Sequence, residues 1–202
     1  MKIVRVETLI STGSFAASRK WAIIRNDVLK EIRAVDWPPG SGKFTIYPES
    51  GKKRGKGNGV KPIKEGLIER LKAKGWKLEE PLSLAVATQP GHVDAVLYTK
   101  DGPVAFEWET GNISSSHRAL NKMGLGLMKG ALAAGVLVVP SRRLYKFLTD
   151  RIGNFDELKP YLDVWKSLPC KKGVLEVVVI EQDAESTSVP RIPKGTAGRA
   201  LA

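Results

Sequence analysis

The sequence predicts an α/β domain in which helices flank a central mixed β-sheet. Short apolar runs alternate with stretches whose apolar residues recur at helical spacing, and no segment is repeated. The chain has 202 residues, of which 42% are hydrophobic. This length suits one domain and allows a core of ordinary size to be buried. We therefore expect a single domain over residues 1–202.

Helices are expected where apolar residues recur every three or four positions. Val28, Leu29 and Ile32 continue such a pattern from the region of Trp21, and hydroxyl side chains from Ser114 onward can cap a helix start. The predicted helices, in order, cover residues 27–32 with an extension toward Trp21, 62–74, 114–128, 142–148 and one or two turns within 155–168.

Strands are expected in short apolar or alternating runs. A tight turn at residues 99–102 separates two such runs, which therefore form a predicted hairpin. Residues 135–139 are continuously apolar, as in a central strand that is buried on both faces. The predicted strands, in order, cover residues 43–47, 93–98, 103–109, 135–139 and 174–180.

Basic charge is concentrated in two segments of the chain. The formal net charge is +12, from 33 Lys and Arg against 21 Asp and Glu. Residues 51–74 hold nine of the basic residues and two acids, and residues 186–202 hold three basic residues and no acid. Prolines and glycines make the second segment an extended basic C-terminal arm. The excess predicts a polyanionic partner, nucleic acid first and an anionic membrane surface second.

Other features exclude several classes of protein. A single cysteine, Cys170, excludes a disulfide scaffold and multi-cysteine metal sites. Arg5 and Glu7 interrupt the apolar N-terminus, which is therefore unlike a signal peptide, and no apolar run approaches the roughly 20 residues that span a bilayer. Residues 40–43 resemble half of a phosphate-binding loop, but Phe44 replaces its Ser or Thr. We expect a cytoplasmic protein with no membrane partner and no nucleotide cofactor.

A candidate metal centre lies on the predicted hairpin. Asp94 stands in the middle of the first strand, where a buried carboxylate needs a partner or a metal. Glu107 and Glu109 project to one face of the second strand, because side chains alternate along it. If Asp94 shares that face, three carboxylates converge, and a hard divalent cation, Mg²⁺ by preference, relieves their repulsion. Solvated acids at an exposed sheet edge would show the same spacing.

The order of an Asp, a hairpin and an acid-x-acid pair is that of the PD-(D/E)xK nucleases. Glu109 stands where most members have lysine. A glycine turn then leads into a helix start rich in hydrogen-bonding groups, where Asn112 can bind an adenine edge and Arg118 a guanine. Simple capping by Asn112 and Ser114 explains the same residues.

Stretches spread over most of the chain resemble the BamHI family of type II restriction endonucleases. The likeness runs with short gaps from about residue 37 to residue 195, and its clearest stretches are residues 58–65 (NGVKPIKE), 106–122 (FEWETGNISSSHRALNK), 145–161 (YKFLTDRIGNFDELKPY) and 189–195 (VPRIPKG). The resemblance implies a PD-(D/E)xK nuclease-like fold and a prokaryotic host. It also implies a homodimer that hydrolyses double-stranded DNA at GGATCC after the first G, leaving a 5′ overhang. The implied cofactor is Mg²⁺, with Mn²⁺ as a substitute.

The resemblance also implies roles for individual residues. Asp94, Glu107 and Glu109 match the family's metal-binding and catalytic acids, and Glu79 matches a further metal-site acid, with Glu80 as the alternative if the register shifts by one. In this scheme the carbonyl of Trp108 completes the metal shell and Glu109 orients the attacking water. The implied DNA-binding residues are Asn112, Ser114, Arg118, Asp150, Arg151 and Lys64, to which we add Lys122 and, in the arm, Arg199.

The helices at residues 114–128 and 142–148 match the family's dimer bundle, where Gly124 and Gly126 would allow close approach. Two other hypotheses fit the same residues. A repair or structure-selective nuclease of the same fold would cut junctions or flaps. A non-catalytic basic DNA-binding protein would bind DNA without Mg²⁺-dependent cleavage.

Overall fold

A six-stranded mixed sheet forms the centre of the protein. The computed structural model describes residues 1–52, 56–81, 91–109, 111–149 and 152–194. The strand order is β1-β7-β6-β5-β4-β3, in which β5, β6 and β7 run parallel and the outer strands pair antiparallel. The strands are β1 (Lys2–Thr12), β3 (Lys77–Pro81), β4 (His92–Leu97), β5 (Val104–Trp108), β6 (Ala134–Pro140) and β7 (Gly173–Glu181), with a separate short parallel pair of β2 (Thr45–Ile46) and β8 (Ala184–Glu185).

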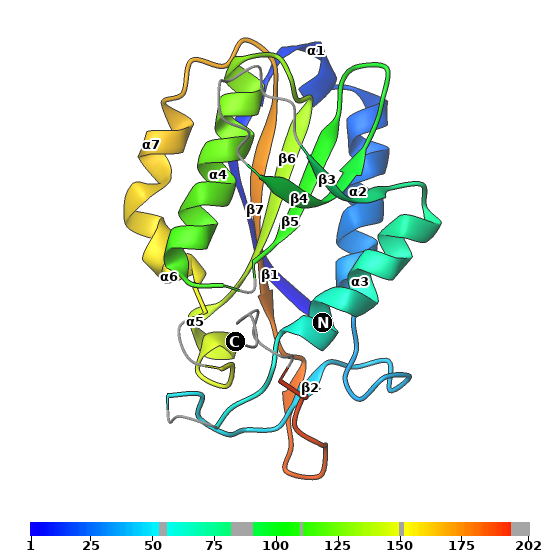
Figure 1. The fold of residues 1–202 in the computed structure, drawn as a ribbon, viewed down its shortest axis with the longest axis vertical. Helices are drawn as coiled ribbons and strands as arrows, with labels where there is room; N and C mark the ends of the chain where they lie inside the picture. The colour runs from blue at the N-terminus through cyan, green and yellow to red at the C-terminus, as the bar shows by residue number, and fades with distance from the viewer. Residues whose placement is uncertain (53–55, 82–90, 110, 150–151, 195–202) are drawn as a thin grey trace, which may run out of the picture.

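Helices cover both faces of this sheet (Figure 1), which confirms the predicted fold class. One apolar core lies between the sheet and the helices α2 and α3, and a second lies under α4, α6 and α7. Every residue of β6 is buried, because this strand is apolar on both faces and has helices above and below it. The helices are α1 (Gly13–Ala16), α2 (Arg19–Arg33), α3 (Lys61–Ala73), α4 (Ile113–Met128), α5 (Arg142–Tyr145), α6 (Phe155–Leu158) and α7 (Leu162–Lys166), with a 3₁₀ turn, η1 (Lys159–Tyr161).

The two edge strands of the sheet were not predicted. β1 pairs with β7 along its length, and β3 pairs with β4. Both carry charged residues and are only partly buried, and their sequences lack the regular alternation of apolar and polar residues that predicts a strand. The segment predicted as a helix over residues 142–148 is helical only in α5. No helix within the described ranges is both long enough and apolar enough to cross a membrane.

Close packing brings α4 against the sheet and against Leu168, which follows α7. A Cβ atom on Gly135 of β6 would lie 2.8 Å from the sulfur of Met123 on α4, so glycine is needed for the helix to approach this strand. A Cβ atom on Gly124 would lie 2.7 Å from a methyl group of Leu168. Gly124 was expected to leave space for a helix of a second subunit. In the structure, Leu168 of the same chain fills that space.

An ion pair with a buried carboxylate joins α2 to β7. The Nε atom of Arg25 lies 2.9 Å from both carboxylate oxygens of Glu176 on β7, and the Thr8 hydroxyl of β1 donates to the same carboxylate at 3.2 Å. The Glu176 side chain is only 5% exposed. Removing the Arg25 guanidinium would leave this carboxylate buried without its counter-charge.

We expect Arg25→Met to lower the free energy of unfolding by about 3 kcal/mol, because breaking one side of a buried ion pair strands the other charge. Urea unfolding without DNA measures the loss. The control is Lys20→Met, which breaks an exposed pair with Asp101 at 3.1 Å and should cost less than about 1 kcal/mol. Equal losses in the two variants would contradict the assignment.

Candidate active site

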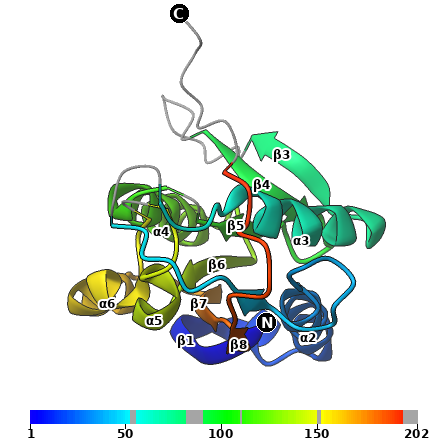
Figure 2. The ribbon, with the colours of Figure 1, turned by 90° about the horizontal axis from the view of Figure 1, so that it is seen from below.

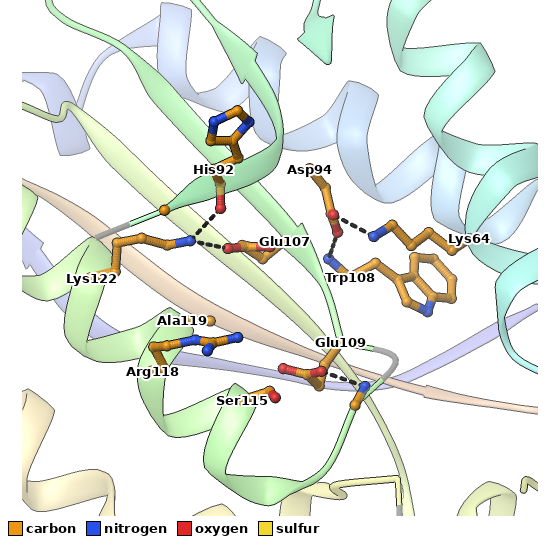
Figure 3. Close-up of a pocket in the computed structure, with 12 residues that line it drawn as sticks. Lys64, His92, Asp94, Glu107, Trp108, Glu109, Ser115, Arg118, Ala119 and Lys122 are labelled. Carbon is orange, nitrogen blue, oxygen red and sulfur yellow. Dashed lines mark hydrogen bonds and ion pairs between the residues drawn. The ribbon is translucent and has the colours of Figure 1, made fainter. Parts of the chain in front are cut away.

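A polar cleft lies where β5 ends and α4 begins. It has a volume of about 420 Å³ and receives side chains from α3, β4, β5 and α4 (Figure 3). Phe106 and Trp108 pack in the core on the α3 side of the sheet, while Glu107 faces α4, as the alternation along the strand predicts. The charged side chains that line the cleft are Lys64, Asp94, Glu107, Glu109, Arg118 and Lys122.

The Asp94 side chain opens the cleft by ending the pairing of β4 with β5. The ladder runs through Leu97–Val104, Val96–Ala105 and Ala95–Phe106 and then stops. Beyond it, the backbone N–H of Trp108 donates to Asp94 Oδ2 at 2.7 Å, so a side chain takes the place of a strand carbonyl. Trp108 stays paired with β6 on its other side. The two strands separate at the point where their carboxylates lie.

Each of two carboxylates in the cleft carries a lysine counter-charge. Lys64 of α3 donates to Asp94, and Lys122 of α4 donates to Glu107 at 2.5 Å and to the His92 carbonyl at 2.6 Å. The Lys122 side chain, which was predicted to bind DNA, is 5% exposed and lies against the carboxylate of Glu107. Although an acid stands at the usual lysine position of the motif, ammonium groups reach the cleft from two helices.

Burial and a neighbouring acid both act on the carboxyl of Glu107. Burial raises the pKa of Glu107, and the neighbouring charge of Asp94 raises it further, while Lys122 and Lys64 lower it. The hairpin pattern in the sequence predicts three carboxylates that converge on a metal ion. Asp94, Glu107 and Glu109 do line one cleft, but within the described ranges no three Asp, Glu, His or Cys side chains form a cluster that could hold an ion.

Glu79 stands beside Asp94 on the neighbouring strand. The register of β3 with β4 pairs Leu78 with Ala95 and Glu80 with Val93, which sets Glu79 opposite Asp94. Glu79 has a φ of 50°, a left-handed conformation that costs a non-glycine residue energy and is often found at functional sites. It lines an adjoining cleft with Asp94 and Lys64.

Glu80, the alternative to Glu79, is turned away from Asp94. Its carboxylate accepts a hydrogen bond from the Tyr98 hydroxyl at 3.0 Å. The structure therefore brings Glu79 to the predicted metal-site acid and directs Glu80 to the end of the hairpin strand β4.

One face of α4 lines the cleft opposite the acids. Ser115, Arg118, Ala119 and Lys122 share this face, because residues three or four apart lie one above another on a helix (Figure 3). Ser115 was not predicted as a site residue, although its spacing from Arg118 was the available signal. Its neighbours Asn112 and Ser114 are exposed at the helix start, and the Asn112 side chain accepts a hydrogen bond from the Ser115 backbone at 3.3 Å.

The turn between β5 and α4 is tied to the third acid of the cleft. The Gly111 backbone N–H donates to Glu109 Oε1 at 2.5 Å. A Cβ atom at Gly111 would lie 2.9 Å from both this oxygen and the Ser115 hydroxyl, so a larger residue would displace them. The other predicted DNA-binding residues, Asp150, Arg151 and Arg199, lie outside the described residues.

The two basic segments, which are distant in sequence, meet in the fold. Figure 2 shows the red C-terminal segment running alongside the cyan loop that precedes α3. Lys194 donates to the Lys56 carbonyl at 2.9 Å, and Arg191 lies 2.8 Å from the carboxylate of Glu49. The Gly57 N–H, followed by the charges of Arg191 and Lys56, lowers the pKa of Glu49. Part of the predicted arm is thus held beside Lys56, in the stretch of residues 51–59 that we call the basic loop.

Comparisons with known proteins agree with this geometry. The chain matches the family described as restriction endonuclease BamHI over residues 1–199. It is 46% identical to the type II restriction enzyme OkrAI of Oceanobacter kriegii over the whole of both chains. It is 34% identical to the type II restriction enzyme BamHI of Bacillus amyloliquefaciens over 180 residues, which cover 86% of this chain and 80% of that enzyme.

A solved structure shares the fold at much lower sequence identity. The crystal structure of restriction endonuclease BglII complexed with a DNA 16-mer matches with a TM-score of 0.60 and 12% identity, over 91% of this chain and 79% of that one. The mixed sheet is therefore that of a restriction endonuclease. Together with the family match along almost the whole sequence, this shows that the chain belongs to the BamHI family of type II restriction endonucleases.

Proposed function

We propose that this restriction endonuclease is a homodimer that uses Mg²⁺ to hydrolyse double-stranded DNA at GGATCC, after the first G. The observation that carries the proposal is the pair of carboxylates, Asp94 and Glu107, at the point where β4 and β5 separate. The similarity to BamHI and OkrAI supports the choice of DNA and of a palindrome. A palindromic site suits a two-fold dimer with one subunit on each half-site.

The chemistry of the donors in the cleft suits a hard divalent cation, although their side chains would have to draw together to hold it. Asp94 and Glu107 already attract positive charge, since an ammonium group lies against each of them. Carboxylate and carbonyl oxygens are the ligands that Mg²⁺ prefers, so Asp94, Glu107 and the Trp108 carbonyl, with Glu79 beside them, would hold it. Mn²⁺ prefers similar ligands and would substitute. Binding would require Lys64 and Lys122 to move off the two acids.

The residues around the acids suit phosphodiester hydrolysis. Bound metal ions would neutralise charge on the phosphate and lower the pKa of the attacking water. Glu109 would orient that water and accept its proton, since its carboxylate is held at the cleft by the Gly111 N–H. Lys64 and Lys122, once displaced from the acids, would lie close enough to neutralise the phosphate.

DNA recognition is assigned to the exposed start of α4 and to the basic segments. Arg118 lies in the cleft beside the acids and is exposed, so it can reach a guanine edge near the scissile bond. Exposed lysines of the basic loop, such as Lys52, would contact phosphates and contribute affinity without selecting a sequence.

We expect the purified protein to cut plasmid DNA only when Mg²⁺ or Mn²⁺ is present, and every sequenced end to begin with 5′-GATCC. Chelation with EDTA should stop cleavage. Sedimentation of the free protein should report a dimer. Ends at junctions or flaps would instead support a structure-selective nuclease, and specific binding without cleavage would support a non-catalytic DNA-binding protein.

Glu107→Ala should abolish Mg²⁺-dependent cleavage and leave specific DNA binding intact, because the acid serves the metal and not the bases. Cleavage of plasmid and gel-shift binding to a GGATCC duplex measure the two properties. The matched control is Asp101→Ala, at an exposed acid that pairs with Lys20 on the surface, which should cut like the unaltered protein. Cleavage by the Glu107 variant at the normal rate would show that the assignment is wrong.

Arg118→Ala should weaken binding to GGATCC DNA by about 1–3 kcal/mol and relax selection at one base pair, as expected when a base contact is lost. The contrasting variant is Lys52→Ala, which should weaken binding to all sequences alike and reduce the salt dependence by roughly one phosphate contact. Binding is measured at several salt concentrations on GGATCC and on singly substituted sites. Identical profiles for the two variants would exclude the base-contact role.

A further inference from the structure

Three distant segments of the chain meet on one buried side chain. Asn58 is fully buried, and its Nδ2 group donates at 2.9 Å to the carbonyls of both Tyr47 and Phe147. Its Oδ1 atom accepts from the backbone of Ile192 at 3.1 Å. The amide therefore joins the basic loop, the segment after α5 and the C-terminal segment. We call this contact the Asn58 junction.

Backbone hydrogen bonds reinforce the Asn58 junction. The N–H of Asn58 donates to the Phe147 carbonyl at 2.7 Å, and the N–H of Thr149 donates to the Asn58 carbonyl at 2.8 Å. Gly59 donates to the Ile192 carbonyl at 2.9 Å. Asn58 thus fixes the position of all three backbones, and its removal would leave buried polar groups without partners.

The backbones approach so closely that side chains are excluded. A Cβ atom on Gly59 would lie 1.9 Å from the Pro193 carbonyl oxygen, and one on Gly51 would lie 1.5 Å from the Leu148 carbonyl oxygen. Because the backbones themselves are in contact at these glycines, the segments can shift very little relative to one another. The loop, the segment after α5 and the C-terminal segment therefore hold one relative position around Asn58.

The Asn58 junction leads directly into the helix that carries Lys64. Gly59 is followed by Val60, the N-cap residue of α3, and the Lys64 N–H donates to the Val60 carbonyl at 3.2 Å. The Lys64 ammonium then reaches Asp94 in the cleft. A shift of the junction would move the first turn of α3 and, with it, this ion pair.

We propose that Asn58 is a positioning residue for DNA cleavage, because the junction it forms sets the start of α3 and thereby places Lys64 at the cleft, where it pairs with Asp94 in the free protein and would meet the phosphate in the complex. The proposal rests on the proposed function, in which Lys64 and Asp94 serve phosphodiester hydrolysis. The anchored part of the basic arm is connected to the start of α3 through the same junction, since the Ile192 N–H donates to Asn58 Oδ1 and the Ile192 carbonyl accepts from the Gly59 N–H.

The test is a double-mutant cycle of Asn58→Ala and Lys64→Met. Single-turnover cleavage of a GGATCC duplex with Mg²⁺ is measured at a temperature where circular dichroism shows every variant folded. Asn58→Ala should slow cleavage on the order of tenfold, and the double variant should be no slower than Lys64→Met alone, because coupled residues are not additive. Multiplication of the two effects, or normal cleavage by Asn58→Ala, would overturn the proposal.

The matched control is Arg25→Met, which removes the counter-charge of the buried Glu176 carboxylate; Arg25 lines neither the junction nor the cleft. It should lower stability while leaving cleavage unchanged at the permissive temperature, and it should be additive with Lys64→Met. If Arg25→Met slows cleavage as much as Asn58→Ala does, general destabilisation explains the effect and the proposal is wrong.

A second readout separates this inference from the proposed function. The same cycle is measured by urea unfolding of the protein without DNA or metal, where Asn58→Ala should reduce the stability lost on Lys64→Met. Additive losses would show that Asn58 does not set the Lys64–Asp94 pair. If the unaltered protein fails to cut DNA while the unfolding cycle shows coupling, the proposed function fails but the placement of Lys64 by Asn58 stands.

Discussion

The Asp94 side chain takes a hydrogen bond that a regular antiparallel ladder would give to a strand carbonyl. By accepting the Trp108 N–H, it ends the pairing of β4 with β5 and leaves a polar opening in an otherwise apolar sheet. The cost of separating the strands is small here, because Asp94 takes the Trp108 N–H while Trp108 stays in register with Val138 of β6, whose carbonyl accepts from the Glu109 N–H. The remaining features of the cleft depend on this separation.

The opening contains the carboxylates of Asp94 and Glu107, and a helix on each face of the sheet supplies a lysine to one of them. Lys64 arrives from α3 and Lys122 from α4, so each of the two nearest acids has a cation from a different layer. This arrangement offsets the repulsion between two partly buried carboxylates. In the proposed mechanism, the same lysines would leave the acids and become available to a phosphate.

The basic segments of the molecule meet at the start of α3, within one helical turn of Lys64. Around Asn58 the loop before α3, the segment after α5 and the C-terminal segment are bound into one unit. The segments that carry much of the positive charge are therefore connected, through the hydrogen bonds of Asn58, to the first turn of α3. Because only a short stretch of chain joins these segments to Lys64, binding of a polyanion to them would affect the position of Lys64.

The sequence by itself determined the class of fold, the central strands and the acids of the hairpin. β6 and β7 were predictable because both of their faces are buried, and the placement of Asp94, Glu107 and Glu109 along one cleft was predictable from the order of the hairpin strands. Only the tertiary structure decided the edge strands β1 and β3, whose charged sequences carry no periodic signal and whose pairing comes from their neighbours. Only the tertiary structure, too, decided the partners of Lys122 and Asn58, because both lie far along the chain from the groups they bind.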